Sequence, residues 1–350
     1  MRLTMHWNSD DSFPVASNRW YAWRPPFGRR TEGESAVRRA TWQWHPLDPL
    51  LVSIPGAERL LPPICFPQLA VALQRRMLRQ YRLLMILIAC MALGFAAAGI
   101  RAEEGLFLKA GATLLLLLVL VGCQYAFIFR DLARLRGYSR FCSWCYLQSQ
   151  TSVVAIILLM LSTGGSQFYL QGWAGSLFGL VEKYGLEFDK AAAQPWRYVT
   201  GPFLHAGLVH WIGNFSLLLV AAGLSFPLGR PRPLWLIFLA GVYLPAFVLT
   251  CLPHWIRSDA FVGVSGGVFA LFGWTAGVAL KNGRAFPVGL GWLVGYFAVA
   301  MAAIASLLDP RASWFAHSSG LLIGVATGML NLGVRLDLDA TSGAPIRSQP

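Results

Sequence analysis

Long stretches without Asp, Glu, Lys or Arg fill most of the chain after residue 82, and they predict its architecture. A bilayer core about 30 Å thick requires about 20 helical residues at 1.5 Å each. A charged side chain at mid-bilayer costs roughly 2.5–3.5 kcal/mol on the insertion scale. The pattern therefore predicts eight membrane helices, one in each of the stretches 83–100, 110–129, 141–181, 198–229, 233–256, 260–280, 285–308 and 312–334.

The stretch 141–181 is longer than one membrane helix needs. Its first part, about 146–165, has the apolar composition of a span. The part that follows, from Gly164 to Leu180, is rich in Gly, Trp and other aromatic residues, which favour the interface between lipid and water. We therefore expect a helix over about 146–165, followed by an interfacial segment.

Basic residues alternate between the predicted connections. Residues 1–82 carry a net charge of +6, and the connections 130–140, 230–232 and 281–284 carry +3, +2 and +2, while every other connection and the C-terminal tail are neutral. The whole net charge of +13 thus lies on one side of an eight-helix protein. Basic loops stay in the cytoplasm, so the alternation predicts that both termini are cytoplasmic.

Composition excludes several classes of protein. With 56% hydrophobic and 13% charged residues, against roughly 25% charged in a soluble domain, the chain is not a soluble enzyme. Its basic residues are scattered between apolar runs, so no nucleic acid is expected as a partner. Its six cysteines are too few for a disulfide-stapled fold. Cys142 and Cys145 form only half of a metal-binding pattern, so neither a metal nor another cofactor is predicted.

The chain is expected to have four parts. They are a basic, Trp- and Pro-rich N-terminal region (1–82), two extra membrane helices with a basic loop (83–140), a core (141–334) and a short tail (335–350). The N-terminal region is equally consistent with a small cytoplasmic domain and with a segment lying on the anionic inner membrane face. Asp10 and Asp11 are unusual for an organelle transit peptide, so a bacterial inner membrane is expected. The sequence leaves the oligomeric state open.

A few polar side chains lie inside the apolar stretches, all near one side of the membrane. Ser265 and His317 are each six residues from the nearest charged residue, roughly 9 Å along a helix. Each helix concerned enters from the non-cytoplasmic side. An intramembrane polar group must either pack or act. Three helices thus contribute candidates at similar depth: His205, His210, Asn214, Ser265 and His317.

These residue types suit acyl transfer, in which a hydroxyl nucleophile needs a base and the tetrahedral intermediate needs hydrogen-bond donors. Ser265 lies between Gly263 and Gly266, where glycines permit a tight turn that exposes its hydroxyl. His317 is the candidate base. No carboxylate lies in its apolar stretch, so a Ser-His dyad is favoured over a triad.

His210 and Asn214 are four residues apart, on one face of a helix, and both side chains can donate hydrogen bonds. They are the predicted oxyanion donors, together with the backbone N–H of Ser265. His205 lies five residues before His210, about 140° away around the helix, which favours a structural role. Glycines at Gly320, Gly324 and Gly273 are spaced for close helix contact, which a dyad split across two helices requires.

From about 146 to 334 the chain resembles the rhomboid intramembrane serine proteases. The residues that carry the resemblance occur in the family's order. They are Trp196-Arg197, His205, the pattern His210-x-x-x-Asn214, the segment GVSGGVFALFGW from Gly263 to Trp274, and Ala316 to Gly320 with Gly324. A single G-x-S-G motif is weak evidence, but the ordered set is specific.

The resemblance implies an all-α polytopic membrane protein with a six-helix core, preceded here by two additional transmembrane helices. It also implies a water-filled outer cavity, a Ser265–His317 dyad, and cleavage of transmembrane protein substrates near the bilayer surface. The loop 166–196 would be partly embedded, with Trp196 and Arg197 as anchors. Phe269 stands where many relatives have Tyr, so the ring that can stack on His317 is kept and its hydroxyl is lost.

Two other functions compete with proteolysis. A catalytically silent relative that binds membrane proteins or serves their quality control would share the fold, although such proteins typically lack the nucleophile or the base. A transporter would show paired polar sites in two related halves, and no such pairing is visible. Ser265 alone would more often be a small packing residue. Together with its partners it predicts an active intramembrane serine endopeptidase.

Overall fold

The computed structural model describes residues 7–16, 18–25, 28, 30–102, 105–252, 260–308 and 313–335. These residues divide into two compact units. The first unit holds the described residues up to Gln150 together with Arg284–Val288, and the second holds those from Thr151 to Gly283 and from Gly289 onward.

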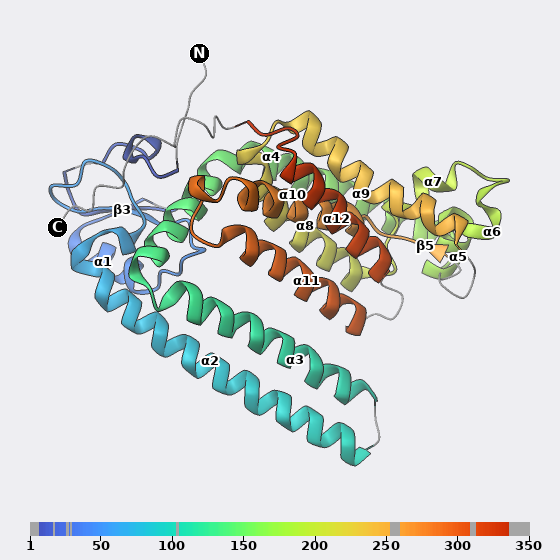
Figure 1. Cartoon of the computed structure of the whole chain (residues 1–350), viewed down its shortest axis with the longest axis horizontal. Coiled ribbons are helices and arrows are strands. Elements are labelled where there is room, and N and C mark those ends of the chain that lie inside the picture. The colour runs from blue at the N-terminus through green and yellow to red at the C-terminus, as the bar shows by residue number, and fades with distance from the viewer. Residues whose placement is uncertain are drawn as a thin grey trace. The chain divides into compact units, whose positions relative to one another are not determined.

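Helices dominate both units (Figure 1), which confirms the predicted all-α polytopic class. Within the described residues, six helical segments are long and apolar enough to cross a membrane. They are Pro67–Ala102 (α2), Gly105–Phe129 (α3, Gly105–Gln124, with the turn that follows it), Thr151–Trp173 in α4, Leu208–Leu228 (α8), Pro231–Cys251 (α9) and Leu290–Leu307 in α11 (Leu290–Leu308). The other two predicted helices, Ser265–Lys281 (α10) and Trp314–Met329 (α12), have 17 and 16 residues.

The N-terminal region of the first unit folds around its own apolar core. A three-stranded antiparallel sheet has the order β2-β1-β3, from Thr31–Glu32, Tyr21–Trp23 and Leu51–Ser53, and the helix α1 spans Glu34–Trp42. Phe13, Trp44 and Ile64 are almost completely buried in this region. The region thus contains a sheet, a helix and fully buried aromatic and aliphatic side chains.

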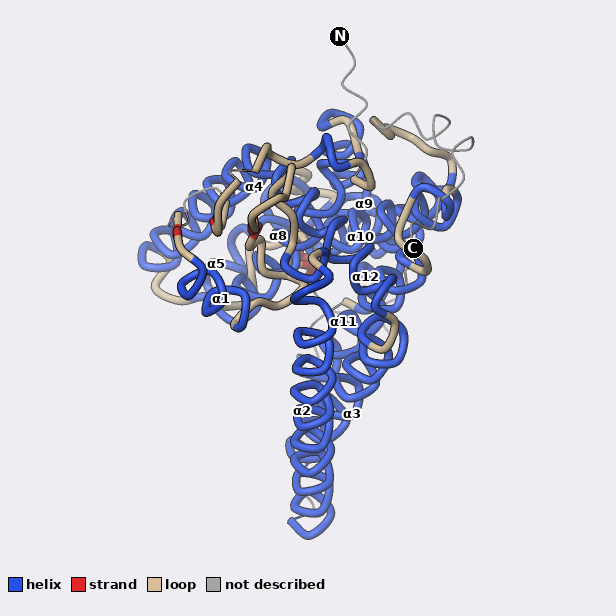
Figure 2. Tube along the Cα trace, turned by 90° about the vertical axis from the view of Figure 1, so that its left-hand side faces the viewer, coloured by secondary structure: helices blue, strands red, loops and turns tan. Residues whose placement is uncertain are grey.

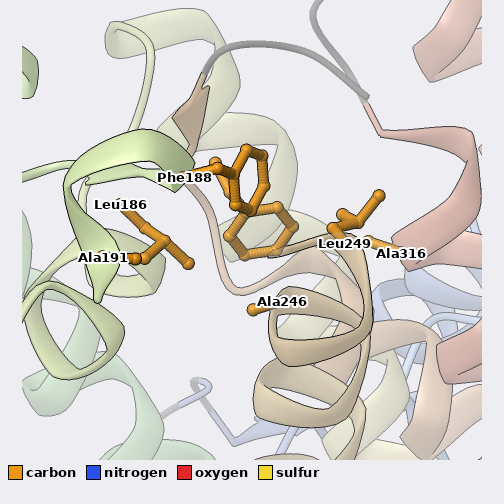
Figure 3. Packing of buried hydrophobic residues seen from close by; sticks show 7 residues of the cluster. Leu186, Phe188, Ala191, Ala246, Leu249 and Ala316 are labelled. Carbon is orange, nitrogen blue, oxygen red and sulfur yellow. The ribbon is translucent and has the colours of Figure 1, made fainter. Parts of the chain in front are cut away.

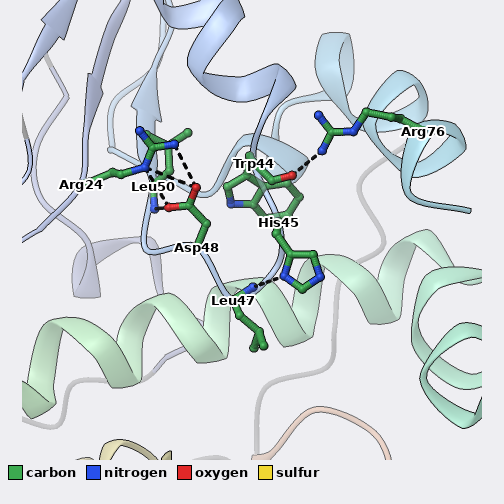
Figure 4. Close-up of polar contacts among 7 residues, drawn as sticks. All are labelled: Arg24, Trp44, His45, Leu47, Asp48, Leu50 and Arg76. Carbon is green, nitrogen blue, oxygen red and sulfur yellow. Dashed lines mark hydrogen bonds and ion pairs between the residues drawn. The ribbon is translucent and has the colours of Figure 1, made fainter. Parts of the chain in front are cut away.

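Polar contacts in this region reach from the loop after α1 to the first long helix (Figure 4). The Arg24 guanidinium donates to both carboxylate oxygens of Asp48, with Nε 3.1 Å from Oδ1 and Nη2 3.0 Å from Oδ2. His45 Nδ1 accepts from the N–H of Leu47, and His45 Nε2 lies 2.8 Å from the Tyr81 hydroxyl on α2. Arg76 of α2 donates to the carbonyl of Trp44.

The helices α2 and α3 lie side by side as a long hairpin (Figures 1 and 2). Small residues allow this contact, because a Cβ on Gly111 would lie 3.3 Å from the Ala92 carbonyl oxygen. The hairpin ends in a π-helical turn, Tyr125–Phe129, whose Phe129 carbonyl accepts from Gln74 Nε2 at 2.9 Å. The predicted spans 83–100 and 110–129 lie inside these helices, and α2 begins 16 residues earlier than predicted, at Pro67.

The helix α4 runs without interruption over Leu132–Trp173. The prediction of a helix over about 146–165 followed by an interfacial segment was therefore wrong. Gly164 and Gly165 do not end the helix. A Cβ on Gly164 would lie 2.7 Å from Cε2 of Trp211, so the absence of a side chain there lets α4 approach α8. Gly in this position serves helix packing rather than termination.

The second unit is a bundle of α4 (from Thr151), α8, α9, α10, α11 and α12, the six helices of the expected core. α10 is buried from Ser265 to Ala279. Its closest neighbour is α12, and glycines bring the two main chains together. A Cβ on Gly320 would overlap the carbonyl oxygen of Gly266, and one on Gly324 would overlap that of Ala270.

Short elements gather at one end of this bundle (Figure 1): α5 (Leu177–Tyr184), β4 (Leu186–Glu187), α6 (Phe188–Ala191), α7 (Arg197–Thr200) and β5 (Ala260–Phe261). β4 pairs antiparallel with β5. A buried apolar cluster joins these elements to the end of α9 and the start of α12 (Figure 3), and its members are Leu186, Phe188, Ala191, Ala246, Leu249, Phe261 and Ala316. Two of them, Phe261 and Ala316, lie close in sequence to Ser265 and His317.

Candidate active site

Ser265 is the first residue of α10 and is only 7% exposed. The turn before it depends on Gly263, whose φ of +108° is a backbone conformation that residues with a Cβ rarely adopt. Because the first N–H groups of a helix have no carbonyl partner within it, the N–H of Ser265 is free of the helix ladder. The positive end of the helix dipole lies at the same place.

His317 lies in the first turn of α12 and is 3% exposed. Ser313 caps this helix through its hydroxyl, which accepts from the N–H of Ala316 at 3.2 Å. The Nε2 atom of His317 is 2.9 Å from the hydroxyl oxygen of Ser265. This separation is within the range in which a base takes a proton from a nucleophile.

Phe269, one turn after Ser265, packs against the His317 ring with centroids 4.6 Å apart and planes inclined by 36°. Among the described residues, His317 Nδ1 has no hydrogen-bond partner. The ring is therefore oriented by packing rather than by a third polar residue. Within the described residues, the Ser265 hydroxyl and the His317 imidazole make a polar contact, and an aromatic ring packs against the imidazole.

His210 and Asn214 of α8 meet the loop before Ser265. A Cβ on Gly263 would lie 3.1 Å from His210 Nε2 and 3.5 Å from Asn214 Nδ2. The N–H of Ala206 donates to His210 Nδ1 at 3.3 Å, so in the neutral ring Nε2 carries the hydrogen. Asn214 is 5% exposed, and its Nδ2 has no hydrogen-bond partner within the described residues. Two N–H donors thus converge beside the nucleophile's loop.

The position of His205 differs from the prediction. α8 begins at Leu208, so His205 is not on the helix, and the expected angle of about 140° from His210 does not apply. The two rings instead lie edge to face, with centroids 5.5 Å apart. His205 is 2% exposed.

The sequence reasoning missed Gln167 of α4. Its amide donates to the carbonyl of His205 and accepts from the N–H of His205, each at 2.8 Å. A polar side chain in an apolar helix would have been the signal. The segment was expected to lie at the membrane interface, where a glutamine can form hydrogen bonds with water, so Gln167 was not singled out.

Trp196 and Arg197 lie at the start of α7, among the short elements at one end of the bundle. Arg197 is 3% exposed and donates to the carbonyls of Gly185 and Glu182 at 2.6 and 2.9 Å, and it lies 3.5 Å from a carboxylate oxygen of Glu187. Trp196 is 43% exposed. The arginine therefore ties the loop after α5 to α7, and through Glu187 to strand β4.

The candidate site offers no obvious metal ligands. In the parts of the chain that the structure describes, no group of three or more His, Cys, Asp or Glu side chains is arranged to hold an ion.

The order and spacing of these residues can be compared with known proteins. The family model described as Rhomboid domain matches residues 192–333, which include His205, Ser265 and His317. The predicted resemblance to the rhomboid family is confirmed for this part of the chain, which contains all the candidate dyad and oxyanion residues.

Relatives of this part of the chain occur in plants and bacteria. RHOMBOID-like protein 6, mitochondrial, of Arabidopsis thaliana is 29% identical over 156 residues, 43% of this chain and 50% of the relative. Rhomboid protease GlpG of Haemophilus influenzae is 25% identical over 153 residues, 42% of this chain and 76% of the relative. RHOMBOID-like protein 2 of Arabidopsis thaliana is 29% identical, over 48% of its length. The matched region spans about half of each Arabidopsis protein.

Proposed function

We propose that the chain is an intramembrane serine endopeptidase in which Ser265 is the nucleophile and His317 the base. The observation that carries this proposal is the 2.9 Å separation of His317 Nε2 from Ser265 Oγ, between two helices held in main-chain contact by glycines. A serine that only packs needs no histidine at hydrogen-bonding distance from its hydroxyl. One of the relatives is named a rhomboid protease.

The reaction follows from these atoms. Ser265 Oγ attacks the substrate carbonyl carbon while His317 Nε2 takes the hydroxyl proton. The negative charge that develops on the carbonyl oxygen accepts hydrogen bonds from the Ser265 N–H, His210 Nε2 and Asn214 Nδ2. His317 then returns the proton to the leaving amine as the C–N bond breaks. Water, deprotonated by the same imidazole, releases the acyl group and restores Ser265.

The proposed substrates are transmembrane segments whose helix is easily unwound. A peptide carbonyl inside an intact helix is hydrogen-bonded and covered by side chains, so Ser265 can reach it only in an extended stretch. We also propose that the basic connections and both termini face the cytoplasm, which places Ser265 and His317 near the outer side. The alternation of charge along the chain supports this orientation.

The direct test is cleavage of a fluorescent transmembrane reporter after reconstitution in lipid vesicles. We expect Ser265→Ala and His317→Ala each to reduce cleavage at least about 10³-fold. Ser306→Ala, which alters a serine whose hydroxyl donates to the carbonyl of Ala302 within α11, is the matched control and should cleave normally. If the folded wild-type protein does not cleave the reporter, the result would instead favour the catalytically silent binding role.

A further inference from the structure

A buried hydrogen-bonded path leads from α4 to the candidate oxyanion donors. It starts at Gln167, which is 5% exposed within a membrane helix. It passes through the main chain of His205 and Ala206 and ends at the imidazole of His210. None of these contacts involves Ser265 or His317.

The main chain at His205 needs this glutamine for a physical reason. His205 and Ala206 lie after a short 3₁₀ turn, which the N–H of Leu204 closes, and before α8, which begins at Leu208. Non-helical backbone at membrane depth must find other hydrogen-bond partners. The Gln167 amide supplies one donor and one acceptor, and it meets both the C=O and the N–H of His205 at 2.8 Å. A single planar side chain thus fixes that residue at both of its polar main-chain atoms.

The next residue transmits this constraint to the site. The Ala206 N–H, directly after the fixed His205, donates to His210 Nδ1 and so keeps the hydrogen of the ring on Nε2. The His205 ring also lies edge to face against the His210 ring, at 5.5 Å between centroids. His210 Nε2 in turn lies beside Gly263, two residues before Ser265. A shift at His205 would therefore move both the orientation and the proton position of His210.

We propose that Gln167 is a positioning residue that sets the tautomer and the direction of His210 as an oxyanion donor, by fixing the backbone of His205. This inference rests on the proposed function. It assigns to α4, which carries no nucleophile or base, a defined part in the reaction. Gly164, one turn earlier, brings α4 against Trp211 and so places the amide within reach of His205.

The test uses the full chain reconstituted in lipid vesicles with the transmembrane reporter. Gln167→Leu is expected to lower kcat by up to about 10²-fold with little change in KM, because the oxyanion donor acts mainly in the transition state. The matched control is Gln171→Leu, which changes a partly exposed glutamine one turn later on the same helix and should leave kcat unchanged. An unchanged kcat in folded Gln167→Leu would overturn the proposal.

A second variant, Gln167→Glu, covers the case in which Gln167→Leu does not fold. This change keeps the shape of the side chain. A protonated carboxyl group offers one donor and one acceptor, as the amide does here, whereas the ionised form has acceptors only. The ratio of the variant's kcat to that of the wild type should therefore fall as pH rises.

Titration of the site histidines affects kcat of both proteins and cancels in this ratio, because His205, His210 and His317 are present in both. The pH dependence of the ratio thus reports on residue 167. A ratio that stays close to one at pH values above the pKa of the introduced carboxyl group would overturn the proposal, since an anchor with no effect on His210 gives that result.

Labelling with a fluorophosphonate probe separates this proposal from the proposed function. If the wild type is not labelled at Ser265, the proposed function fails. If the wild type is labelled and Gln167→Leu is labelled at the same rate, only the positioning role fails. We expect the wild type and Gln167→Leu both to be labelled, the variant at a lower rate, because phosphonylation also develops charge on an oxygen near His210.

Discussion

The α2–α3 hairpin and the α10–α12 pair are both contacts between two membrane helices, but they are built differently. In the most apolar part of α2, and likewise of the segment Gly105–Phe129 that contains α3, only 11% of the residues are buried. α10, in contrast, is buried from Ser265 to Ala279. Apolar surface on a membrane helix is stable in lipid, so the hairpin needs few partners. α10 instead lies in the interior of a protein bundle, with one face of α12 packed against it.

The glycines of the two pairs show what the difference means. Gly324 and Gly320 of α12 lie directly against main-chain atoms of α10, where any Cβ would overlap. In the hairpin the approach is less close: a Cβ on Gly99 would lie 2.9 Å from the main-chain N of Leu108, and one on Gly111 would lie 3.3 Å from the carbonyl oxygen of Ala92. The closer contact thus occurs where a hydroxyl and an imidazole on separate helices lie 2.9 Å apart.

The largest expected effect is on folding. Gly324→Val would push α12 away from the carbonyl of Ala270, so we expect the free energy of unfolding to fall by about 4 kcal/mol or more. The measurement is thermal unfolding in detergent together with reporter cleavage. The matched change in the hairpin, Gly111→Val, should lower the free energy of unfolding by only about 1–3 kcal/mol, because a Cβ there would lie 3.3 Å from the carbonyl oxygen of Ala92 rather than overlap a carbonyl oxygen. If both substitutions lowered the free energy of unfolding equally, the α10–α12 pair would not be packed more closely than the α2–α3 hairpin.

Asn214→Ala separates chemistry from packing. Its Nδ2 has no partner within the described residues, so its loss should cost little stability while kcat falls by about 10²–10³-fold. Steady-state cleavage and thermal unfolding measured on the same sample test both parts. Asn282→Ala is the amide control, because Asn282 bonds to Asn331 at the far end of α10. An unchanged kcat for Asn214→Ala would reassign Asn214 to packing.

Phe269→Leu tests the contact between the rings of Phe269 on α10 and His317 on α12. Loss of an aromatic pair costs about 0.5–1.5 kcal/mol, so kcat should fall by up to about ten-fold. Phe269→Tyr keeps the ring and should retain activity within a few-fold. If Phe269→Leu cleaves as fast as the wild type, the ring does not orient the base.

The smallest effect is expected beside the hairpin, at His45. Burial lowers the pKa of His45 below its ordinary value, with Asp48 opposing this shift and Arg76 adding to it. The neutral ring is therefore favoured by folding, and its contribution to stability is complete above the unfolded pKa and lost as pH falls through the folded pKa.

Hydrogen–deuterium exchange of the segment around His45, corrected for intrinsic rates, should show more opening at about pH 5 than at about pH 7.5. His45→Gln, which has no titrating ring, should flatten this dependence. A wild type and a variant with the same pH dependence would exclude His45 as its source.

Much of the fold could be predicted because lipid imposes a simple rule. Each of the eight charge-free stretches overlaps a helix, six of which are long and apolar enough to cross a membrane, and polar residues within these stretches pointed to Ser265, His317, His210 and Asn214 as candidates. The continuous α4 could not be predicted, because Gly164 has the same appearance whether it ends a helix or packs against Trp211. The place of His205 and the role of Gln167 depend on where α8 begins, which is set by tertiary contacts with α4.

The most direct test of the central claim is labelling of the purified protein with a fluorophosphonate, with the modified residue mapped by mass spectrometry. The account predicts a single adduct on Ser265 that is absent in Ser265→Ala and at least about 10³-fold slower in His317→Ala. Labelling of His317→Ala at the wild-type rate, or no labelling of folded wild type, would contradict activation of Ser265 by His317.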